Sequence, residues 1–255
     1  MALSVRSFRC RSDNIGLLVG NDASGEALLV DAPAEEPIVR EVEASGWVPS
    51  AVLVTHHHSD HTAAILALKS RFGLRVLGPA AEADRIPGID ELLPSEGVLR
   101  MLGEEIRIIP TPGHTRGHLS YYFSAAGMVF TGDTLFALGC GRLVECDAPT
   151  MLASLHRLRA LPPQTLLWCG HDYFEKNARF ALTLEPENAG LRERAALARG
   201  LAADNAVPSP STIGLETATN PFLRWDSPAL RVGLGLAGAA DVDVFAETRR
   251  RRDTF

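Results

Sequence analysis

Four histidines and one aspartate lie within six positions of the segment Thr55–Thr62, which reads Thr-His-His-His-Ser-Asp-His-Thr. The segment directly follows the apolar run Ala51–Val54. Imidazole and carboxylate groups are the ligands that suit zinc, iron and manganese in proteins. The first hypothesis for this chain is therefore a metal site, which could activate water or polarise a carbonyl group.

The spacing in this segment indicates which histidines act together. If Ala51–Val54 is a buried strand, the residues after it stay nearly extended, so His56 and His58 project to one side and His57 to the other. We therefore expect His57 to be structural rather than a ligand. A solvated polar loop or a purification tag is the alternative, but a tag would be terminal and uninterrupted.

The residues that follow are predicted to turn into a helix over 63–72. Thr62 is placed to be its N-cap, and Gly73 stands where a left-handed C-cap is expected. Asp60 and His61 would then lie in the turn between strand and helix, where several side chains can converge.

Other candidate ligands also follow predicted strands. They are His114 after the strand 106–109, Asp133 after the strand 128–130, and His171 after the strand 165–169. Active sites of layered α/β folds gather at strand ends. We therefore expect these three residues and the histidine-rich segment to meet at one place.

The composition is that of an ordinary soluble enzyme of one large or two modest domains. The 255 residues carry a formal net charge of −6, which argues against nucleic-acid binding. No apolar stretch reaches the roughly 20 residues of a membrane span, and no secretory signal is recognisable. The four cysteines show no C-x-x-C spacing and are expected to be reduced. These features predict a cytoplasmic location, no membrane partner, and a monomer or weak oligomer.

The pattern of elements predicts an α/β fold. Antiparallel pairs alternate with helical crossovers up to residue 172, which favours a four-layered αββα sandwich over 1–172. The expected strands are 14–19, 26–30, 51–54, 74–77, 106–109, 119–123, 128–130 and 165–169, with 14–19 and 26–30 as a hairpin. The expected helices are 37–45, 63–72 and 150–160. From 173 onward strand-like runs vanish and helix formers dominate, at 174–184 and 189–204, so 173–255 is predicted to be a small helical domain.

Longer motifs surround the candidate ligands. They are Thr55-His56-x-His58-x-Asp60-His61, Pro112-Gly113-His114-Thr115-x-Gly117-His118, Thr131-Gly132-Asp133-Thr134-Leu135-Phe136 and Gly170-His171-x-Tyr173. Together they resemble the glyoxalase II (hydroxyacylglutathione hydrolase) family of the metallo-β-lactamase superfamily. The resemblance continues through 139–142, 185–188, 218–222 and the arginines 249–252, and so covers nearly the whole chain. It implies a metallo-β-lactamase-like catalytic domain followed by a helical substrate-binding domain.

The resemblance implies two divalent metal ions, zinc first, with iron or manganese as alternatives. The implied ligands are His56, His58 and His114 for one ion and Asp60, His61 and His171 for the other, with Asp133 as the bridge. Asp60 and Asp133 would also be catalytic, and Asp60 would orient the attacking hydroxide. His118 would lie beside the ligands and donate to a carboxylate or a backbone carbonyl, and the alternative for it is an ordinary hydrogen-bonded histidine at a strand end.

The resemblance also implies substrate contacts. Glutathione has two carboxylates, and arginine can bind carboxylates bidentately. The matching positions are Arg142, Tyr173, Asn177, Arg249 and Arg252. Taken alone, the arginines 249–252 would be a solvated helix end. The chain departs from the family at 144–146, where Val-Glu-Cys stands in place of an aromatic residue followed by Glu-Gly.

The expected reaction is hydrolysis of S-D-lactoylglutathione to D-lactate and glutathione, the second step of methylglyoxal detoxification. A thiolate is a good leaving group, so the reaction needs no dedicated general acid. One alternative is a thioesterase for another thiol, because the departure at 144–146 affects the glutathione site. Another is a glutathione persulfide dioxygenase with a single iron, against which the helical part at 173–255 counts. A binding protein without catalysis would have lost ligands, and none is missing.

Overall fold

Two six-stranded sheets form the centre of the molecule, and the computed structural model describes residues 3–204, 206–208 and 210–255. The first sheet has the order β1-β2-β3-β4-β5-β6. Its strands are β1 (Leu3–Arg9), β2 (Ile15–Asn21), β3 (Glu26–Val30), β4 (Val48–Leu53), β5 (Arg75–Pro79) and β6 (Glu91–Leu93). The second has the order β14-β13-β10-β9-β8-β7. Its strands are β7 (Gly97–Met101), β8 (Glu104–Pro110), β9 (Leu119–Phe123), β10 (Met128–Phe130), β13 (Leu166–Trp168) and β14 (Ser211–Thr212).

The first sheet combines a hairpin with parallel crossovers. β2 and β3 pair antiparallel with Leu17 opposite Val30, so the predicted hairpin is confirmed. β3, β4, β5 and β6 are parallel neighbours. Strands of this kind are covered on both faces, which explains their nearly continuous apolar sequences.

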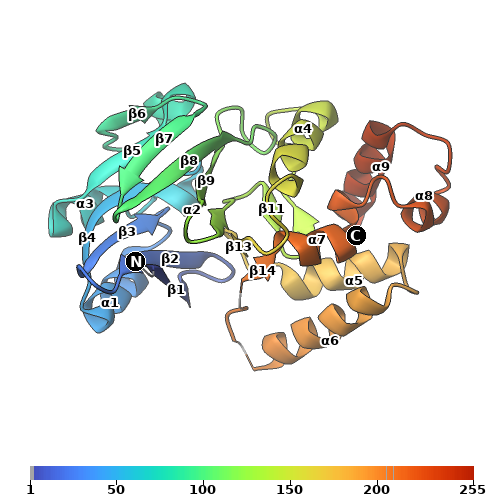
Figure 1. Cartoon of the computed structure of the whole chain (residues 1–255), viewed down its shortest axis with the longest axis horizontal. Helices are drawn as coiled ribbons and strands as arrows, with labels where there is room; N and C mark the ends of the chain where they lie inside the picture. Colours follow the sequence, from blue (N-terminus) through green and yellow to red (C-terminus); the bar gives the residue numbers. More distant parts are fainter. Residues whose placement is uncertain (1–2, 205, 209) are drawn as a thin grey trace.

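Helices complete four layers. On the outer face of the first sheet, Ile38 of α1 (Glu35–Ser45) and Leu68 of α3 (Ile65–Phe72) pack in one buried cluster with Leu29 of β3. Residues of both sheets share a second cluster between them. On the outer face of the second sheet, Leu155 of α4 (Ala148–Arg159) packs with Val129 of β10. The predicted four-layered αββα sandwich is confirmed, and its layers can be followed in Figure 1.

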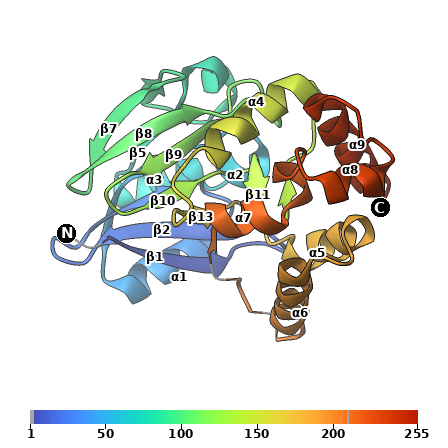
Figure 2. The same cartoon turned by 45° about the vertical axis from the view of Figure 1, so that its right-hand side comes forward.

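The chain after residue 173 is mainly helical. It contains α5 (Phe174–Leu184), α6 (Ala189–Ala203), α7 (Ile213–Thr219), the 3-10 turn η2 (Pro221–Leu223), α8 (Pro228–Leu234) and α9 (Asp241–Thr254). Helices α5, α6, α8 and α9 lie together at one end of the molecule (Figures 1 and 2). The expectation that strands vanish here is wrong at β14, which pairs with β13. Two residues are too few to leave an alternating pattern. The division between 172 and 173 stays a prediction.

The helix after the histidine-rich segment is built differently from the prediction. Ser59–Thr62 forms a short helix, α2, and α3 begins only at Ile65. Thr62 therefore does not cap a helix, and its hydroxyl instead donates to the carbonyl of His58 at 3.1 Å. Gly73 has φ 68° and is the left-handed C-cap that was predicted. Asp60 and His61 thus lie on a helical turn, which fixes them more firmly than an open turn would.

The remaining elements are short. They are η1 (Ala80–Arg85) and the two-stranded hairpin of β11 (Leu135–Phe136) and β12 (Gly139–Cys140). The four cysteines are unpaired. Among the described residues, no helix is both long and apolar enough to cross a bilayer.

Candidate metal centre and substrate cavity

Four strand ends place the candidate ligands at one edge of the two sheets. The segments that carry them follow β4, β8, β10 and β13. β8 and β10 are both antiparallel to β9, and β10 is parallel to β13, so these three strands of the second sheet end at the same edge. The structure brings all seven predicted ligands into one cluster there.

Three histidines form the first group of the cluster. Nε2 of His56 lies 3.1 Å from Nδ1 of His58, and Nε2 of His114 lies 2.9 Å from that same atom. One ring nitrogen from each of the three lies within 4.8 Å of the others. Three imidazole nitrogens in this arrangement are a common ligand set for a divalent metal ion.

Asp60, His61 and His171 form the second group, again with ligand atoms within 4.8 Å of one another. Nε2 of His171 lies 3.2 Å from Nε2 of His61 and 3.2 Å from Oδ2 of Asp60. Asp133 lies between the groups. Its Oδ1 is 3.2 Å from Nε2 of His61, and its Oδ2 is 3.4 Å from Nε2 of His171 and 3.5 Å from Nε2 of His114.

The other ring nitrogen of three histidines faces an oxygen that can only accept. The pairs are His114 Nδ1 with the Arg142 carbonyl at 3.0 Å, His61 Nδ1 with Asp31 Oδ2 at 2.8 Å, and His171 Nδ1 with Asp13 Oδ1 at 3.2 Å. Each Nδ1 must therefore donate, and Nε2 of the neutral ring presents a lone pair to the cluster. Oδ1 of Asp133 is buried there and accepts no hydrogen bond from the described residues. This convergence of lone pairs and carboxylates fits a cation.

The carboxylates of the cluster raise the pKa of two of its histidines. Burial lowers the pKa of His61, but Asp133 and Asp31 outweigh burial and raise it well above its usual value. Burial likewise opposes protonation of His171, whereas hydrogen bonds to Asp133 and Asp60 raise its pKa to about 9. The same bond to His171 lowers the pKa of Asp60. A cation bound here would replace these protons, so metal binding is coupled to proton release.

Asp31 is a further residue of the centre that is missing from the residues predicted above. Its Oδ1 accepts from the Thr55 amide at 2.7 Å, and its Oδ2 accepts from the Thr55 hydroxyl at 2.8 Å in addition to His61. Asn14, also not predicted, donates from Nδ2 to Oδ2 of Asp60 at 3.2 Å. The signal for Asp31 was available in the sequence, because it directly follows the buried strand Glu26–Val30.

His57 belongs to neither ligand group, although its ring centroid lies 4.7 Å from that of His58. Its Nδ1 lies 2.6 Å from Oε2 of Glu82, which also accepts from the His57 amide at 2.8 Å. Oε1 of the same glutamate accepts from the Gly117 amide at 2.8 Å. Glu82 therefore ties the histidine-rich loop to the loop that carries His114.

His118 is fully buried beside Asp133, but its hydrogen bonds differ from the prediction. Its Nε2 accepts from the Asp133 amide at 3.1 Å, so the proton of the neutral ring is on Nδ1. Nδ1 lies 2.9 Å from the Thr111 hydroxyl and 3.2 Å from the Thr134 hydroxyl. Burial lowers the pKa of His118 well below its usual value and keeps the ring neutral. The ring therefore holds the backbone of Asp133 as an acceptor.

A cavity of about 470 Å³ adjoins both ligand groups. The predicted substrate-binding residues all line it, namely Arg142, Tyr173, Asn177, Arg249 and Arg252. The Tyr173 ring stacks on the His171 ring with 4.9 Å between centroids and 5° between planes. The cavity thus joins the cluster to a wall that carries several cations.

Arg249 and Arg252 of α9 differ in the protein groups that they bind. Arg249 is 5% exposed, donates from Nη1 to the Cys140 carbonyl at 2.8 Å, and lies over the Phe222 ring at 5.0 Å. Arg252 donates from Nε and Nη2 to Oδ1 of Asn177 at 3.2 and 3.1 Å. Asn177 itself donates from Nδ2 to the Ala137 carbonyl.

Two more residues of the cavity wall bear on the substrate. Val144 lines the cavity with 57% of its surface exposed, where the family pattern has an aromatic residue. Lys176, which the sequence did not single out, lines it next to Asn177 on α5. The wall therefore has one more cation and one aromatic ring fewer than expected.

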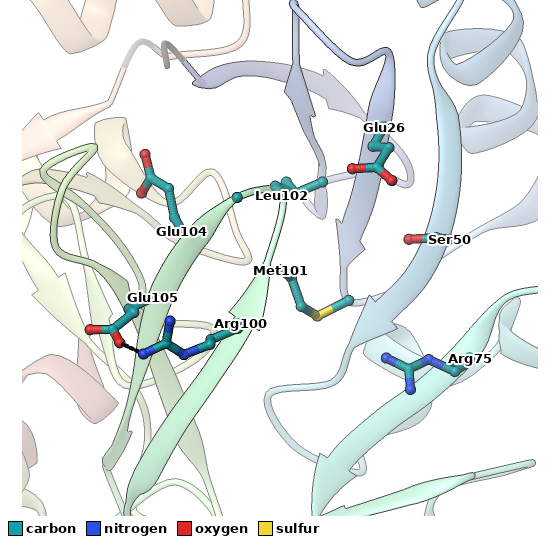
Figure 3. A pocket seen from close by; sticks show the side chains of 9 residues that line it. Glu26, Ser50, Arg75, Arg100, Met101, Leu102, Glu104 and Glu105 are labelled. Carbon is teal, nitrogen blue, oxygen red and sulfur yellow. Dashed lines mark hydrogen bonds and ion pairs between the residues drawn. The ribbon is translucent and has the colours of Figure 1, made fainter.

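A second cavity, of about 480 Å³, lies at the opposite ends of the parallel strands (Figure 3). It includes Glu26 at the start of β3, Arg75 at the start of β5 and the turn between β7 and β8. Arg100 and Glu105 pair at its edge. Among the described residues that line it there is no histidine or cysteine. Its chemistry is that of a charged surface hollow.

Two family models match the chain. The metallo-beta-lactamase superfamily model matches 9–171, and the model of the hydroxyacylglutathione hydrolase C-terminus matches 172–255. A curated relative named hydroxyacylglutathione hydrolase, from Mesorhizobium japonicum, is 52% identical over 255 residues and covers 100% of both chains. Another of that name, from Rhizobium meliloti, is 47% identical over 254 residues, 100% of this chain and 99% of the relative.

Solved structures show the same fold. The crystal structure of ETHE1 from Myxococcus xanthus has a TM-score of 0.68 at 24% identity and covers 97% of this chain and 90% of that one. The structure of TTHA1623 in a di-iron-bound form has a TM-score of 0.61 at 26% identity and covers 86% of this chain and 100% of that one. The resemblance stated from the motifs is confirmed by the family models and the curated relatives. The chain belongs to the hydroxyacylglutathione hydrolase family of the metallo-β-lactamase superfamily.

Proposed function

We propose that this chain hydrolyses S-2-hydroxyacylglutathione thioesters, with S-D-lactoylglutathione as substrate and D-lactate and glutathione as products. The observation that carries the proposal is the pair of three-ligand groups joined by Asp133 beside a cavity lined by arginines. The names of relatives that are 47% and 52% identical over the full length support the same reaction. It would be the second step of methylglyoxal detoxification.

The proposed cofactor is a pair of divalent metal ions. His56, His58 and His114 would hold one ion, Asp60, His61 and His171 the other, and Asp133 would contact both. When bound, such ions supply Lewis acidity and lower the pKa of a coordinated water towards about 7. We propose zinc, with iron or manganese as alternatives, because nitrogen and oxygen ligands suit all three. The di-iron form of TTHA1623 supports keeping iron among them.

We assign to Asp60 the role of orienting the attacking water. Asn14 donates to its Oδ2, and the contact with His171 lowers its pKa, so the carboxylate stays ionised and can accept a proton of that water. The Asp60 side chain is 36% exposed, so water can reach it from the cavity. The leaving thiolate has a conjugate acid of pKa about 8.5, so its departure needs little help.

Glutathione would bind along the cationic wall of the cavity. The guanidinium groups of Arg142 and Arg252 match its carboxylates in charge and geometry. Tyr173 is held on the His171 ring, and burial raises the pKa of its hydroxyl, so that group stays a neutral donor at the inner end of the site. We assign Asn177 and Arg249 to the same wall, where both also bind backbone carbonyls.

A thioester of another thiol is the second candidate, and Val144 is the observation that favours it. An isopropyl group that is 57% exposed cannot stack on the peptide as an aromatic ring would. Hydrolysis would be retained, but selectivity for glutathione would fall. Lys176 offers a compensating contact for a carboxylate.

Metal analysis combined with a thioester panel tests the proposal. The panel compares S-D-lactoylglutathione with the lactoyl thioesters of coenzyme A and N-acetylcysteamine at equal concentration. We expect about two ions per chain and the highest kcat/KM for the glutathione thioester. Equal rates for all three thioesters would favour the second candidate. Oxygen uptake with glutathione persulfide, without thioester hydrolysis, would replace the hydrolase by a dioxygenase.

We also propose a cytoplasmic location. The four cysteines are unpaired in the structure, which suits a reducing compartment. Fractionation of cells that express the chain, with compartment-specific marker enzymes, would test this.

A further inference from the structure

The hairpin β11–β12 connects two parts of the metal cluster. Asp133 lies just before its first strand, and Arg142 lies just after its second. The carbonyl of Arg142 accepts the Nδ1 proton of His114 and so directs Nε2 into the cluster. A shift of the hairpin would therefore move Asp133, which contacts both ligand groups. It would also turn the ring of His114, which belongs to the first group.

Side chains from the helical part of the chain hold the hairpin at every backbone position from Phe136 to Cys140. Asn220 donates from Nδ2 to the carbonyls of Phe136 and Gly139 at 3.2 and 3.1 Å. Oε2 of Glu216 accepts from the Leu138 amide at 2.8 Å. The remaining bonds are Asn177 Nδ2 to the Ala137 carbonyl at 3.0 Å and Arg249 Nη1 to the Cys140 carbonyl at 2.8 Å.

The turn of this hairpin does not hold its shape by itself. Leu138 has φ 56°, a left-handed conformation that costs energy in a residue with a branched side chain. Its side chain is 0% exposed and packs with Phe174 and Leu191 of α5 and α6. The bond to Glu216 and this packing keep the turn in a conformation that leucine would otherwise leave.

Glu216 is an unusual residue to find at this place. It is 0% exposed, and its Oε1 accepts from Nη2 of Arg194 at 2.5 Å, while Oε2 also accepts from Nδ2 of Asn220 at 2.9 Å. Nη1 of Arg194 donates to the Thr219 hydroxyl at 2.7 Å. Burying such an ion pair is costly and is weak evidence for a role in stability. The pair is better explained by the geometry that it fixes, because Glu216 binds the Leu138 amide and Asn220 in one arrangement.

We propose that Glu216 and Asn220 are positioning residues of the metal centre: by fixing the hairpin β11–β12, they hold Asp133 at one end and the carbonyl that orients His114 at the other. The helical part of the chain then shapes the metal centre as well as the substrate wall. This inference rests on the proposed function only in taking the cluster to bind divalent metal ions.

The test compares Glu216→Gln and Asn220→Ala with a matched control, Glu185→Gln. Glu185 is 6% exposed in the same helical part and accepts from Arg224 Nε and Nη2 at 2.8 Å each. No hydrogen bond joins it to the hairpin among the described residues. All three variants should lose thermal stability, so stability by itself does not separate them.

Cobalt(II) titration gives the deciding measurement, followed by its absorption spectrum and by chelator competition. We expect Glu216→Gln and Asn220→Ala to bind one of the two ions about 10- to 100-fold more weakly, with an altered spectrum. The control should keep the wild-type affinity and spectrum. With S-D-lactoylglutathione at saturating metal, kcat should fall in both hairpin variants by a larger factor than KM rises, since Tyr173, Lys176 and Arg252 of the substrate wall lie outside the hairpin.

Wild-type metal affinity and spectrum in both hairpin variants, with stability lost as in the control, would overturn the inference and leave Glu216 a structural residue only. If the wild-type protein bound metal but hydrolysed no thioester, the proposed function would fail. The cobalt measurements would still decide the role of the hairpin. If Glu216→Gln does not fold, Asn220→Ala carries the same test. It removes the Nδ2 group that donates to the Phe136 and Gly139 carbonyls and leaves the Arg194–Glu216 pair intact.

Discussion

Replacement of Asp31 by asparagine should weaken metal binding by a predictable amount. The carboxylate of Asp31 accepts three hydrogen bonds, from the amide and hydroxyl of Thr55 and from Nδ1 of His61. Asparagine has the same shape but only one acceptor oxygen. Whichever way the amide is turned, either the Thr55 amide or the His61 imidazole is left facing an NH₂ group.

The cost follows from that loss. A buried donor left without an acceptor costs about 1–3 kcal/mol, and Asp31 is only 4% exposed. For a chain of this size, each kcal/mol lowers Tm by about 2–4 °C. Loss of the partner that orients a histidine ligand lowers metal affinity about 10- to 100-fold. The second group of ligands, which contains His61, should therefore lose its ion first.

Chelator competition against zinc and thermal unfolding with and without metal measure the two effects. Asp90→Asn is the control. Asp90 also accepts from a backbone amide, that of Val76 at 2.9 Å, and from Lys69, but it lies at the surface away from the cluster. Wild-type affinity for both ions in Asp31→Asn would refute the reasoning, because it would mean that His61 does not need Asp31 to present its lone pair.

Other variants and conditions give further expectations. Asp133→Ala should abolish thioester hydrolysis and lower the bound metal, which metal analysis of the purified variant checks; full activity with unchanged metal would exclude a bridging role. Arg252→Ala should raise KM for the glutathione thioester much more than it lowers kcat, and a collapse of kcat instead would contradict its placement on the substrate wall. Burial raises the pKa of Cys140 to about 11, so iodoacetamide should label this thiol slowly at pH 8 and faster as the pH approaches 11, as followed by mass spectrometry. The pKa of His171 is about 9, so a proton must leave it when metal binds at pH 7; metal affinity should rise between pH 6 and 9, and an affinity independent of pH would contradict this.

The ligands were predictable because their signals are local. Each candidate ligand comes after a strand that ends in apolar residues, namely β4, β8, β10 or β13, and these short apolar runs mark the strands. Strand alternation was also enough to separate His57 from His56 and His58. The layered α/β fold followed from the order of strands and helices.

The features that the sequence did not reveal depend on distant contacts. Glu82 and Glu216 lie on ordinary helical sequence, and only the folded chain brings them to Gly117 and Leu138. Thr62 looked like an N-cap because its local sequence suits one, but a backbone bond from the His61 amide to the His58 carbonyl closes a helical turn before it. The candidate metal ligands can thus be read from short motifs, whereas the groups that hold them in place cannot.

The strand β14 is made late, but it pairs with a strand that leads to a candidate ligand. It pairs with the outer edge of β13, the strand that leads to His171, and lies between α6 and α7 in the chain. Chains emerge from the ribosome N-terminus first, so the four ligands of the histidine-rich segment are made long before β13 gains its neighbour. A nascent chain that has reached only α6 contains every candidate ligand, but β13 still has an open edge and neither Glu216 nor Asn220 has been made. If Glu216 and Asn220 fix the hairpin β11–β12 as proposed, tight metal binding is expected only after nearly the whole of this chain has been made.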